Sequence, residues 1–202
     1  MPRADGARTR ERIIDAAAGV LADLGLGRAT TKEIARAAGI SEAALYKHFS
    51  GKEEIFIRVL RDRLPGFGAT VFDDPDRAAA SGVAENLAGI ARAAVRFYTA
   101  SFPIASSVFL ERALLERHRA SVLELGAGPR GPVDRLTAYL RTERDRGRIR
   151  ADTDTEHAAA LFVGACFQRG FFCAYDGTDL TDPELDAFAT GLAETLMRGL
   201  AR

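Results

Sequence analysis

Residues 30–53 read TTKEIARAAGISEAALYKHFSGKE, and this segment predicts two short helices joined by a tight turn. Thr30 with Glu33 three residues later forms a capping box, which opens a short helix. Gly39 ends that helix in a tight turn, where a side chain would be strained. A second short helix is predicted over residues 42–48. Two short helices joined by such a turn have the dimensions of a helix-turn-helix.

The second of these helices carries side chains that suit the major groove of DNA. Ile34 can pack against Ile40 and Leu45, which fixes the two helices at a steep angle. Helix N-termini at Thr31 and at the Lys52 turn offer free backbone N–H groups to phosphates. The residues expected at the groove are small, polar or basic: Glu42, Ala43, Ala44, Tyr46, Lys47 and His48.

Charge is unevenly distributed along the chain. The 202 residues contain 28 basic and 28 acidic side chains, so the chain as a whole is neutral. Residues 1–52, however, contain nine basic and six acidic side chains, which leaves this part at +3 and the remainder at −3. Because local rather than total charge attracts phosphates, the neutral total does not exclude a nucleic-acid partner.

Helical periodicity dominates the rest of the chain, and no run alternates strictly as a strand would. The sequence therefore predicts an all-α protein of about nine helices. Pro103 is expected to end one long helix. Residues 66–77 are predicted to be a connector, and Ser50 with Glu53 is predicted to form a further capping box. The expected helices cover residues 9–24, 30–38, 42–48, 50–64, 78–101, 104–125, 133–146, 155–175 and 183–200.

The motif resembles the DNA-binding head of the TetR family of bacterial repressors. The resemblance covers about residues 9–58, and two positions depart from the family pattern. Position 26 is Leu where an aromatic residue is common, and Ala44 stands where a hydroxyl residue is frequent. The residues that carry the resemblance are 30–35, 38–41, 45–49 and 52–53.

This resemblance implies a homodimeric repressor that binds a palindromic operator in double-stranded DNA. A small molecule bound by the body would release the operator. Thr31 and Lys32 would meet the DNA backbone, Lys52 would bind a phosphate, and the six groove residues named above would lie at the bases. The expected division is a DNA-binding domain over residues 1–52 and a ligand-binding and dimerisation domain over residues 53–202.

Two features of the body fit these roles. The region rich in phenylalanine also contains polar side chains, as a pocket for a mostly apolar effector would, although plain core packing explains most of the aromatics. The last two helices carry small residues at intervals, such as Gly164 and Gly191, and we expect them to form the dimer interface. The expected pocket residues are Phe97, Ser101, Phe109, Phe162 and Gln168.

Other kinds of chemistry find little support. The three histidines are scattered, no catalytic residue stands out, and Cys166 and Cys173 are expected to be buried apolar residues rather than metal ligands. Residues 126–131 spell GxGxxG, but a helix rather than a strand is predicted before them, so no cofactor is expected. The N-terminus has no apolar signal segment, and we expect a cytoplasmic protein without a membrane span. The alternatives are a DNA-binding regulator without a small-molecule effector and, with no residue pattern in its favour, an enzyme on a helical scaffold.

Overall fold

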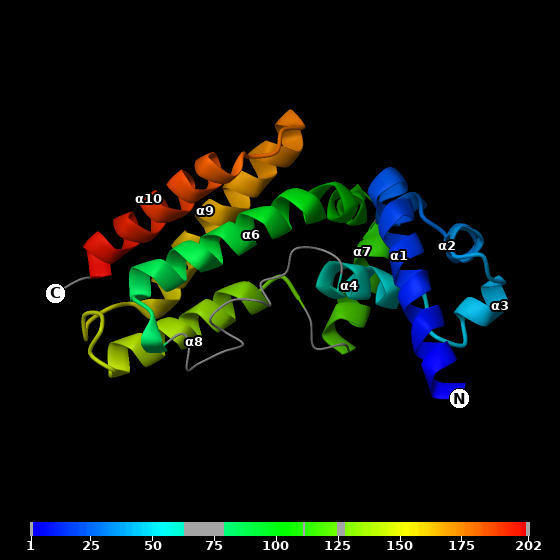
Figure 1. Ribbon diagram of the computed structural model, residues 1–202, viewed down its shortest axis with the longest axis horizontal. Coiled ribbons are helices and arrows are strands. Elements are labelled where there is room, and N and C mark those ends of the chain that lie inside the picture. The colour runs from blue at the N-terminus through cyan, green and yellow to red at the C-terminus, as the bar shows by residue number, and fades with distance from the viewer. Residues whose placement is uncertain (1, 63–78, 111, 125–127, 201–202) are drawn as a thin grey trace. The chain divides into compact units, whose positions relative to one another are not determined.

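The computed structural model describes residues 2–62, 79–110, 112–124 and 128–200, and it forms two compact units (Figure 1). The first unit comprises residues 1–64 and 101–128, and the second comprises residues 65–100 and 129–202, in each case less the residues outside the description. Helices are the regular elements of the described residues, and no strand occurs among them. The predicted all-α fold is confirmed.

The first unit is built around the N-terminal helix. This helix, α1, contacts α2, α4 and the 3-10 helix η2, while α3 contacts α2 and α4 contacts α7. The glycine at position 25 interrupts α1 with a φ of 68°, in the left-handed region that glycine adopts without strain. The elements are α1 (Pro2–Arg28), α2 (Thr31–Ala37), α3 (Glu42–Leu45), α4 (Lys52–Asp62), η2 (Ser107–Leu110) and α7 (Arg112–Glu124).

One apolar cluster holds the first unit together. Residues of α1 at helical spacing face inward and meet buried side chains from α2, α3 and α4. Two further members, Ile104 and Val108, come from the segment that follows residue 100. The cluster is therefore completed by residues far apart in the sequence. Its largest fully buried members are Ile13, Ile14, Leu21, Leu26, Ile34, Leu45, Ile55 and Phe56.

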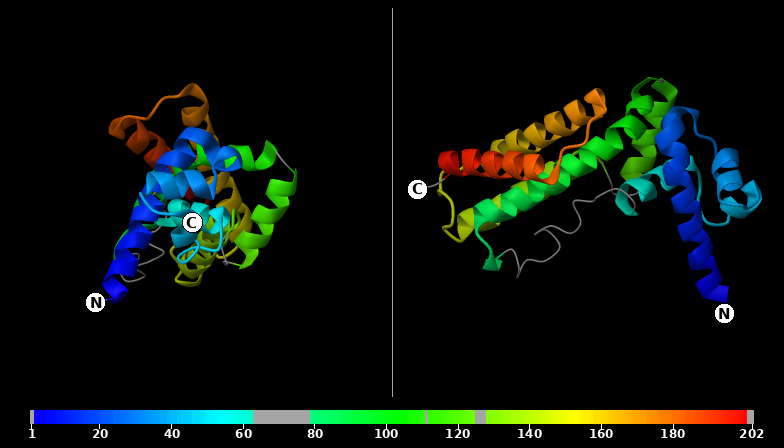
Figure 2. Two further views of the ribbon diagram at one scale, coloured as in Figure 1. Left: turned by 90° about the vertical axis from the view of Figure 1, so that its right-hand side faces the viewer. Right: turned by 45° about the horizontal axis from the view of Figure 1, so that its top comes forward.

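The second unit is a set of longer helices. Helix α9 contacts both α8 and α10, and α9 and α10 lie beside each other and run in opposite directions (Figures 1 and 2). Helix α6 belongs to this unit as far as residue 100. The elements are α6 (Val83–Ser106), α8 (Gly131–Asp145), α9 (Thr155–Asp176) and α10 (Asp182–Leu200).

Helices α6 and α9 approach each other closely at one glycine. A Cβ on Gly170 would lie 2.5 Å from Cβ of Tyr98 and 3.0 Å from the backbone nitrogen of Thr99. Gly164, on the same helix, would meet nothing within 4 Å. The close contact therefore depends on Gly170, which the sequence analysis did not single out.

The predicted helices are present, but several of their bounds are wrong. Helix α1 covers Pro2–Arg28 instead of 9–24, and α3 ends at Leu45 instead of 48. The segment predicted as one helix over 104–125 is divided among the end of α6, η2 and α7. Pro103 does not end its helix, because α6 continues one turn beyond it to Ser106. The carboxylate that accepts from the Ser50 backbone is that of Glu54, not Glu53, at 2.8 Å. The predicted connector at 66–77 lies outside the described residues, as do residues 125–127 of the GxGxxG segment.

Helix α9 is long and apolar enough to cross a membrane by length and composition alone. In the window that meets this test, 39% of the residues are buried. Phe162 and Cys166 lie in the core of the second unit, while Leu161 and Phe172 lie on the exposed side. A core helix with a second, exposed apolar face has the same hydropathy, so this feature is weak support for a membrane span.

Candidate nucleic-acid interface

The turn between α2 and α3 has the geometry predicted from the sequence. Gly39 has a φ of 66°, and the backbone N–H of Ile40 donates to the carbonyl of Ala35 at 3.0 Å. The hydroxyl of Ser41 accepts from the N–H of Ala44 at 3.2 Å and caps α3. Leu45 is fully buried, so this side of α3 faces the core.

The other side of α3 is accessible. Tyr46 is 51% exposed, and Ala43 and Lys47 are exposed as well. Glu42 and His48 are half-buried. The structure thus brings the predicted groove residues onto one short segment whose inner face is anchored by Leu45.

Three of the predicted DNA-binding residues form a hydrogen-bonded group. The hydroxyl of Thr31, at the start of α2, donates to Oε1 of Glu42 at 2.5 Å. The same hydroxyl oxygen lies 3.2 Å from the phenol oxygen of Tyr46. These contacts join α2 to both ends of α3. The spacing of residues in the sequence did not predict this group, because Glu42 and Tyr46 lie 11 and 15 positions after Thr31.

Lys52 has partners within the chain itself. Its ammonium donates to the carbonyl oxygens of Leu26 at 2.9 Å, Ala29 at 3.2 Å and Gly27 at 3.4 Å. A cation beside carbonyls at the end of a helix interacts favourably with the helix dipole. The predicted phosphate contact of Lys52 stays a prediction, and the structure gives this side chain a structural role at the end of α1.

Arg10 is a residue whose part in this region the sequence analysis missed. Its guanidinium lies 4.3 Å from the ring centroid of Phe49 and donates to the carbonyl of His48 at 2.8 Å. It also pairs with Glu54 at 3.1 Å. Arg10 lies three residues before the buried Ile13, and this position on the inward stripe of α1 was the available signal.

The carboxylate of Glu54 accepts hydrogen bonds from several donors. Burial by itself would raise the pKa of Glu54, but hydrogen bonds from the backbone and hydroxyl of Ser50 and from Arg10 outweigh that effect and lower it. The charged form is therefore favoured in the folded protein. This charge keeps Arg10, and through it the end of the motif, in place.

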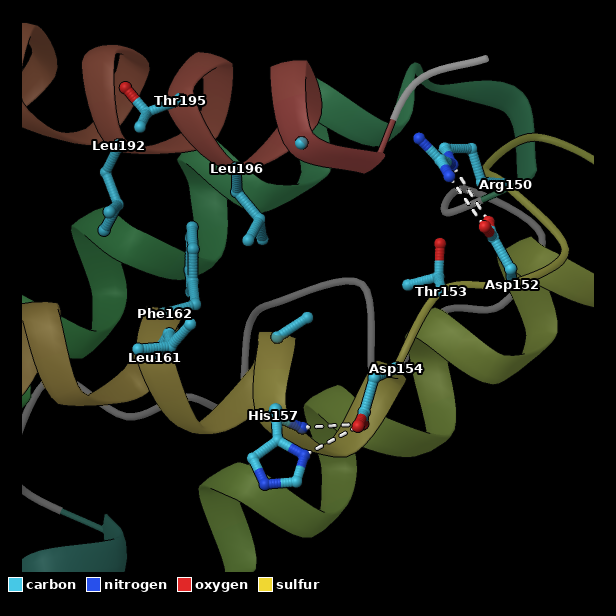
Figure 3. A pocket seen from close by; sticks show the side chains of 12 residues that line it. Arg150, Asp152, Thr153, Asp154, His157, Leu161, Phe162, Leu192, Thr195 and Leu196 are labelled. Atoms are coloured by element: carbon cyan, nitrogen blue, oxygen red, sulfur yellow. Dashed lines mark hydrogen bonds and ion pairs between the residues drawn. The ribbon is translucent and has the colours of Figure 1, made fainter.

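The second unit contains a hollow of about 570 Å³ between α9 and α10 (Figure 3). Phe162 on α9 points toward Leu192 and Leu196 on α10 and forms its apolar floor. Its rim carries an ion pair between Arg150 and Asp152 at 2.6 Å, and Nδ1 of His157 lies 2.7 Å from Oδ2 of Asp154. The lining is Arg150, Asp152, Thr153, Asp154, His157, Ala158, Leu161, Phe162, Leu192, Thr195, Leu196 and Gly199.

The five predicted effector residues are not gathered around this hollow. Phe162 lines it, whereas Gln168 and Phe109 are exposed, the latter to 73%. Ser101 is buried and Phe97 is half-buried. The predicted effector pocket therefore stays a prediction.

Among the described residues, no group of three or more His, Cys, Asp or Glu side chains could hold a metal ion. Cys166 and Cys173 are buried free thiols, and burial raises the pKa of Cys166 to about 12. A thiol held protonated in this way is a poor nucleophile and a poor ligand. Both cysteines are buried on α9, as predicted.

A capped helix-turn-helix with an accessible second helix and basic side chains around it defines a DNA-binding protein. The family model for bacterial regulatory proteins of the tetR family matches residues 13–59. The HTH-type transcriptional regulator SrpR of Pseudomonas putida is 47% identical over 60 residues, which are 30% of this chain and 28% of that protein. The head of this chain is therefore similar to the regulators of the tetR family.

The first curated relatives are matched over 28% to 45% of their own length, so their likeness concerns the head. Solved structures extend the likeness of fold to the body. A candidate tetR-family regulator from Mesorhizobium loti has a TM-score of 0.70 at 20% identity over 98% of each chain. FadR from Bacillus subtilis, in complex with stearoyl-CoA, has a TM-score of 0.67 at 19% identity over 94% of this chain and 98% of its own.

Proposed function

We propose that this protein is a cytoplasmic transcriptional repressor that binds a palindromic operator as a homodimer and is released by a small molecule. The observation that carries the proposal is the accessible α3 segment. Its inner face is anchored by Leu45, and Tyr46 and Lys47 are exposed on the outer side. In helix-turn-helix proteins the second helix enters the major groove with its N-terminal residues at the base edges.

DNA binding is tested by titrating the full chain against duplex DNA at several salt concentrations. Lys32 and Lys47 are exposed and are proposed to contact phosphate or bases. Replacing either by Met should reduce the slope of log affinity against log salt by about one per subunit if it neutralises one phosphate. Binding that does not depend on salt, or no binding to any duplex, would contradict the proposed function.

The dimer is proposed to form through the exposed side of α9 together with α10. Five residues of α9 at helical spacing are exposed, and we call them the outward stripe. Three of them are large and apolar, and a Cβ on Gly164 would meet nothing within 4 Å among the described residues, so a second helix can approach closely there. A two-fold operator requires a two-fold protein. The outward stripe is Leu161, Gly164, Gln168, Phe172 and Tyr175.

Sedimentation measures the dimer directly. Leu161→Glu places a charge on the outward stripe and should shift the protein from dimer to monomer and weaken operator binding. Leu123→Glu is the matched control, because Leu123 is similarly exposed but lies on α7. A wild type that sediments as a monomer at micromolar concentration, or equal effects of both variants, would argue against this interface.

An effector site in the body is proposed by analogy with FadR, which was solved in complex with stearoyl-CoA. The residues proposed to line it remain Phe97, Ser101, Phe109, Phe162 and Gln168, with a mostly apolar ligand. A ligand releases DNA only if it binds the DNA-free state more tightly than the DNA-bound state. Typical coupling of about 1–3 kcal/mol would lower operator affinity about 5- to 150-fold.

Reciprocity provides the test of this switch. Compounds that raise the unfolding temperature of the protein would be titrated by calorimetry with and without operator DNA. Operator must weaken compound binding by the factor by which the compound weakens operator binding. Compounds that bind the protein yet leave operator affinity unchanged would favour a regulator without a small-molecule effector.

A further inference from the structure

We propose that Glu42 selects cytosine in each half-site and that Thr31 is the positioning residue that aims its carboxylate. This inference rests on the proposed DNA-binding function. Glu42 is the first residue of α3, and N-terminal residues of a recognition helix contact base edges. The geometry that carries the proposal is the hydrogen-bonded group of Thr31, Glu42 and Tyr46.

The direction of each hydrogen bond in this group follows from the number of protons available. An ionised carboxylate only accepts, so the 2.5 Å contact requires Thr31 to donate its proton to Glu42. Threonine has a single hydroxyl proton. The phenol of Tyr46, 3.2 Å from the same oxygen, must therefore donate its own proton to Thr31. The order is Tyr46 to Thr31 to Glu42.

This order leaves acceptors toward the DNA. The phenol proton of Tyr46 is engaged, so its oxygen can only accept from a further partner. Glu42 has no second hydrogen-bond partner among the described residues, and its other carboxylate oxygen, Oε2, also can only accept. Ala43 and Ala44, which follow on α3, add methyl groups and no donor.

A pair of acceptors discriminates among the four bases. Guanine presents two acceptors in the major groove and thymine presents one, so both are electrostatically unfavourable beside a carboxylate. Adenine presents an amino group next to the acceptor N7. Cytosine presents its N4 amino group without an acceptor of its own beside it, and a carboxylate accepting from that amino group is the expected pair.

Thr31 contributes by holding a flexible side chain before DNA arrives. An unrestrained glutamate loses rotamer freedom when it binds, whereas a carboxylate fixed in advance loses less. Thr31 is not the cap of α2, because Thr30 and Glu33 form the capping box. Its hydroxyl can therefore be removed without removing the cap of the helix.

Selection of binding sites from random duplexes tests the proposal with the 202-residue chain. Wild type should enrich cytosine at one position of each half-site. Glu42→Gln should shift the preference to adenine, because glutamine bonds adenine N6 and N7 together. If this variant retains the cytosine preference of wild type, or wild type shows no cytosine preference, Glu42 is not the reader.

Two further variants test the positioning role. Thr31→Val keeps the shape of the side chain and should reduce the preference for cytosine about fivefold or more, the factor typical of one mismatched pair. Thr31→Ser retains the hydroxyl and should restore the wild-type preference. Neither change alters charge, so the salt dependence of binding should stay constant. Equal preferences in the valine and serine variants would overturn the role of Thr31.

The outcomes separate this inference from the function on which it rests. A wild-type protein that binds no duplex at any salt concentration contradicts both. A wild-type protein that binds duplex DNA with the expected salt dependence, and whose Glu42→Gln variant selects the same sites, contradicts only the inference. Unfolding temperatures of all four proteins would show that each variant is folded.

Discussion

The helix-turn-helix region of the first unit and the α6–α9 contact of the second unit are held by different interactions. In the first, charged side chains reach backbone carbonyls: Arg10 bonds the carbonyl of His48, and Lys52 bonds three carbonyls at the end of α1. In the second, Gly170 lets α6 and α9 approach so closely that a single methyl group would overlap Tyr98.

These two modes respond differently to substitution. Replacing the charged donor removes its hydrogen bond, but an uncharged side chain of similar size still fits in the same space. A close helix contact tolerates loss of charge nearby and does not tolerate added volume. We therefore expect the free energy of unfolding to depend on side-chain volume at the α6–α9 contact. In the helix-turn-helix region we expect it to depend on the hydrogen bonds.

The largest expected effect is at Gly170. Gly170→Ala places a Cβ 2.5 Å from Cβ of Tyr98, which forces the two helices apart. The free energy of unfolding, measured with denaturant, should fall by about 2–3 kcal/mol. Gly19→Ala, at an exposed position of α1, is the control and should raise it by about 0.5–1 kcal/mol, because alanine favours helix and the added Cβ would meet none of the described atoms within 4 Å. Equal effects at both glycines would rule out the close contact.

The next effect is at Lys52. Lys52→Met removes hydrogen bonds to two carbonyls of α1 and to that of Ala29 just after it, and should lower the free energy of unfolding by about 1–2 kcal/mol. Lys32→Met, at an exposed position, should leave stability unchanged. Measuring both variants against DNA sharpens the comparison. A lower affinity of the Lys52 variant with an unchanged salt slope indicates a structural role, and a reduced slope indicates a phosphate contact.

A smaller effect is expected at His118, which packs on α4. Its ring centroid is 5.3 Å from that of Phe56, and burial lowers its pKa despite the opposing effect of Glu53. The unfolded chain then binds the proton more readily, so stability should be full above about pH 6.5 and decline as the pH falls below it. Thermal unfolding between pH 8 and pH 5 would measure this. His118→Phe should remove the decline, and a decline that persists would assign it to another group.

The smallest effect concerns Glu54 and appears in more acidic solution. Burial opposes the shift, but the hydrogen bonds from Ser50 and Arg10 prevail and lower the pKa of Glu54. Its contribution to stability is therefore present above the pKa of an unfolded glutamate, about 4.3, and is lost as the pH falls through the folded value. Glu54→Gln should flatten the acid limb of the stability curve. If the loss of stability in acid is the same in this variant as in the wild type, other carboxylates are responsible for it.

The sequence was most informative where the interactions are local. The Thr30–Glu33 box and the Gly39 turn depend on residues within a few positions of each other, and the structure confirms both. The carbonyls bonded by Lys52 lie 23 to 26 residues away, and spacing rules contain no information about such partners. The lysine was therefore predicted only as a candidate phosphate ligand.

Packing between helices was also beyond the sequence pattern. Gly164 and Gly170 lie on one helix, and composition does not reveal which of them faces a neighbour. The same limit applies to the prediction of the effector residues, because the sequence does not reveal that Phe162 is buried in the core and Phe109 is exposed. Which side of a helix is buried depends on the helices that pack against it.

The composition of the first unit has a consequence for the order in which the protein can be made. Its apolar cluster joins Ile14 and Phe56 to Ile104 and Val108, so residues beyond position 100 complete the core around the DNA-reading motif. A chain emerging from the ribosome exposes the first part of this cluster while the second part is still being translated. The motif can acquire its full core only when more than half of the protein has been synthesised.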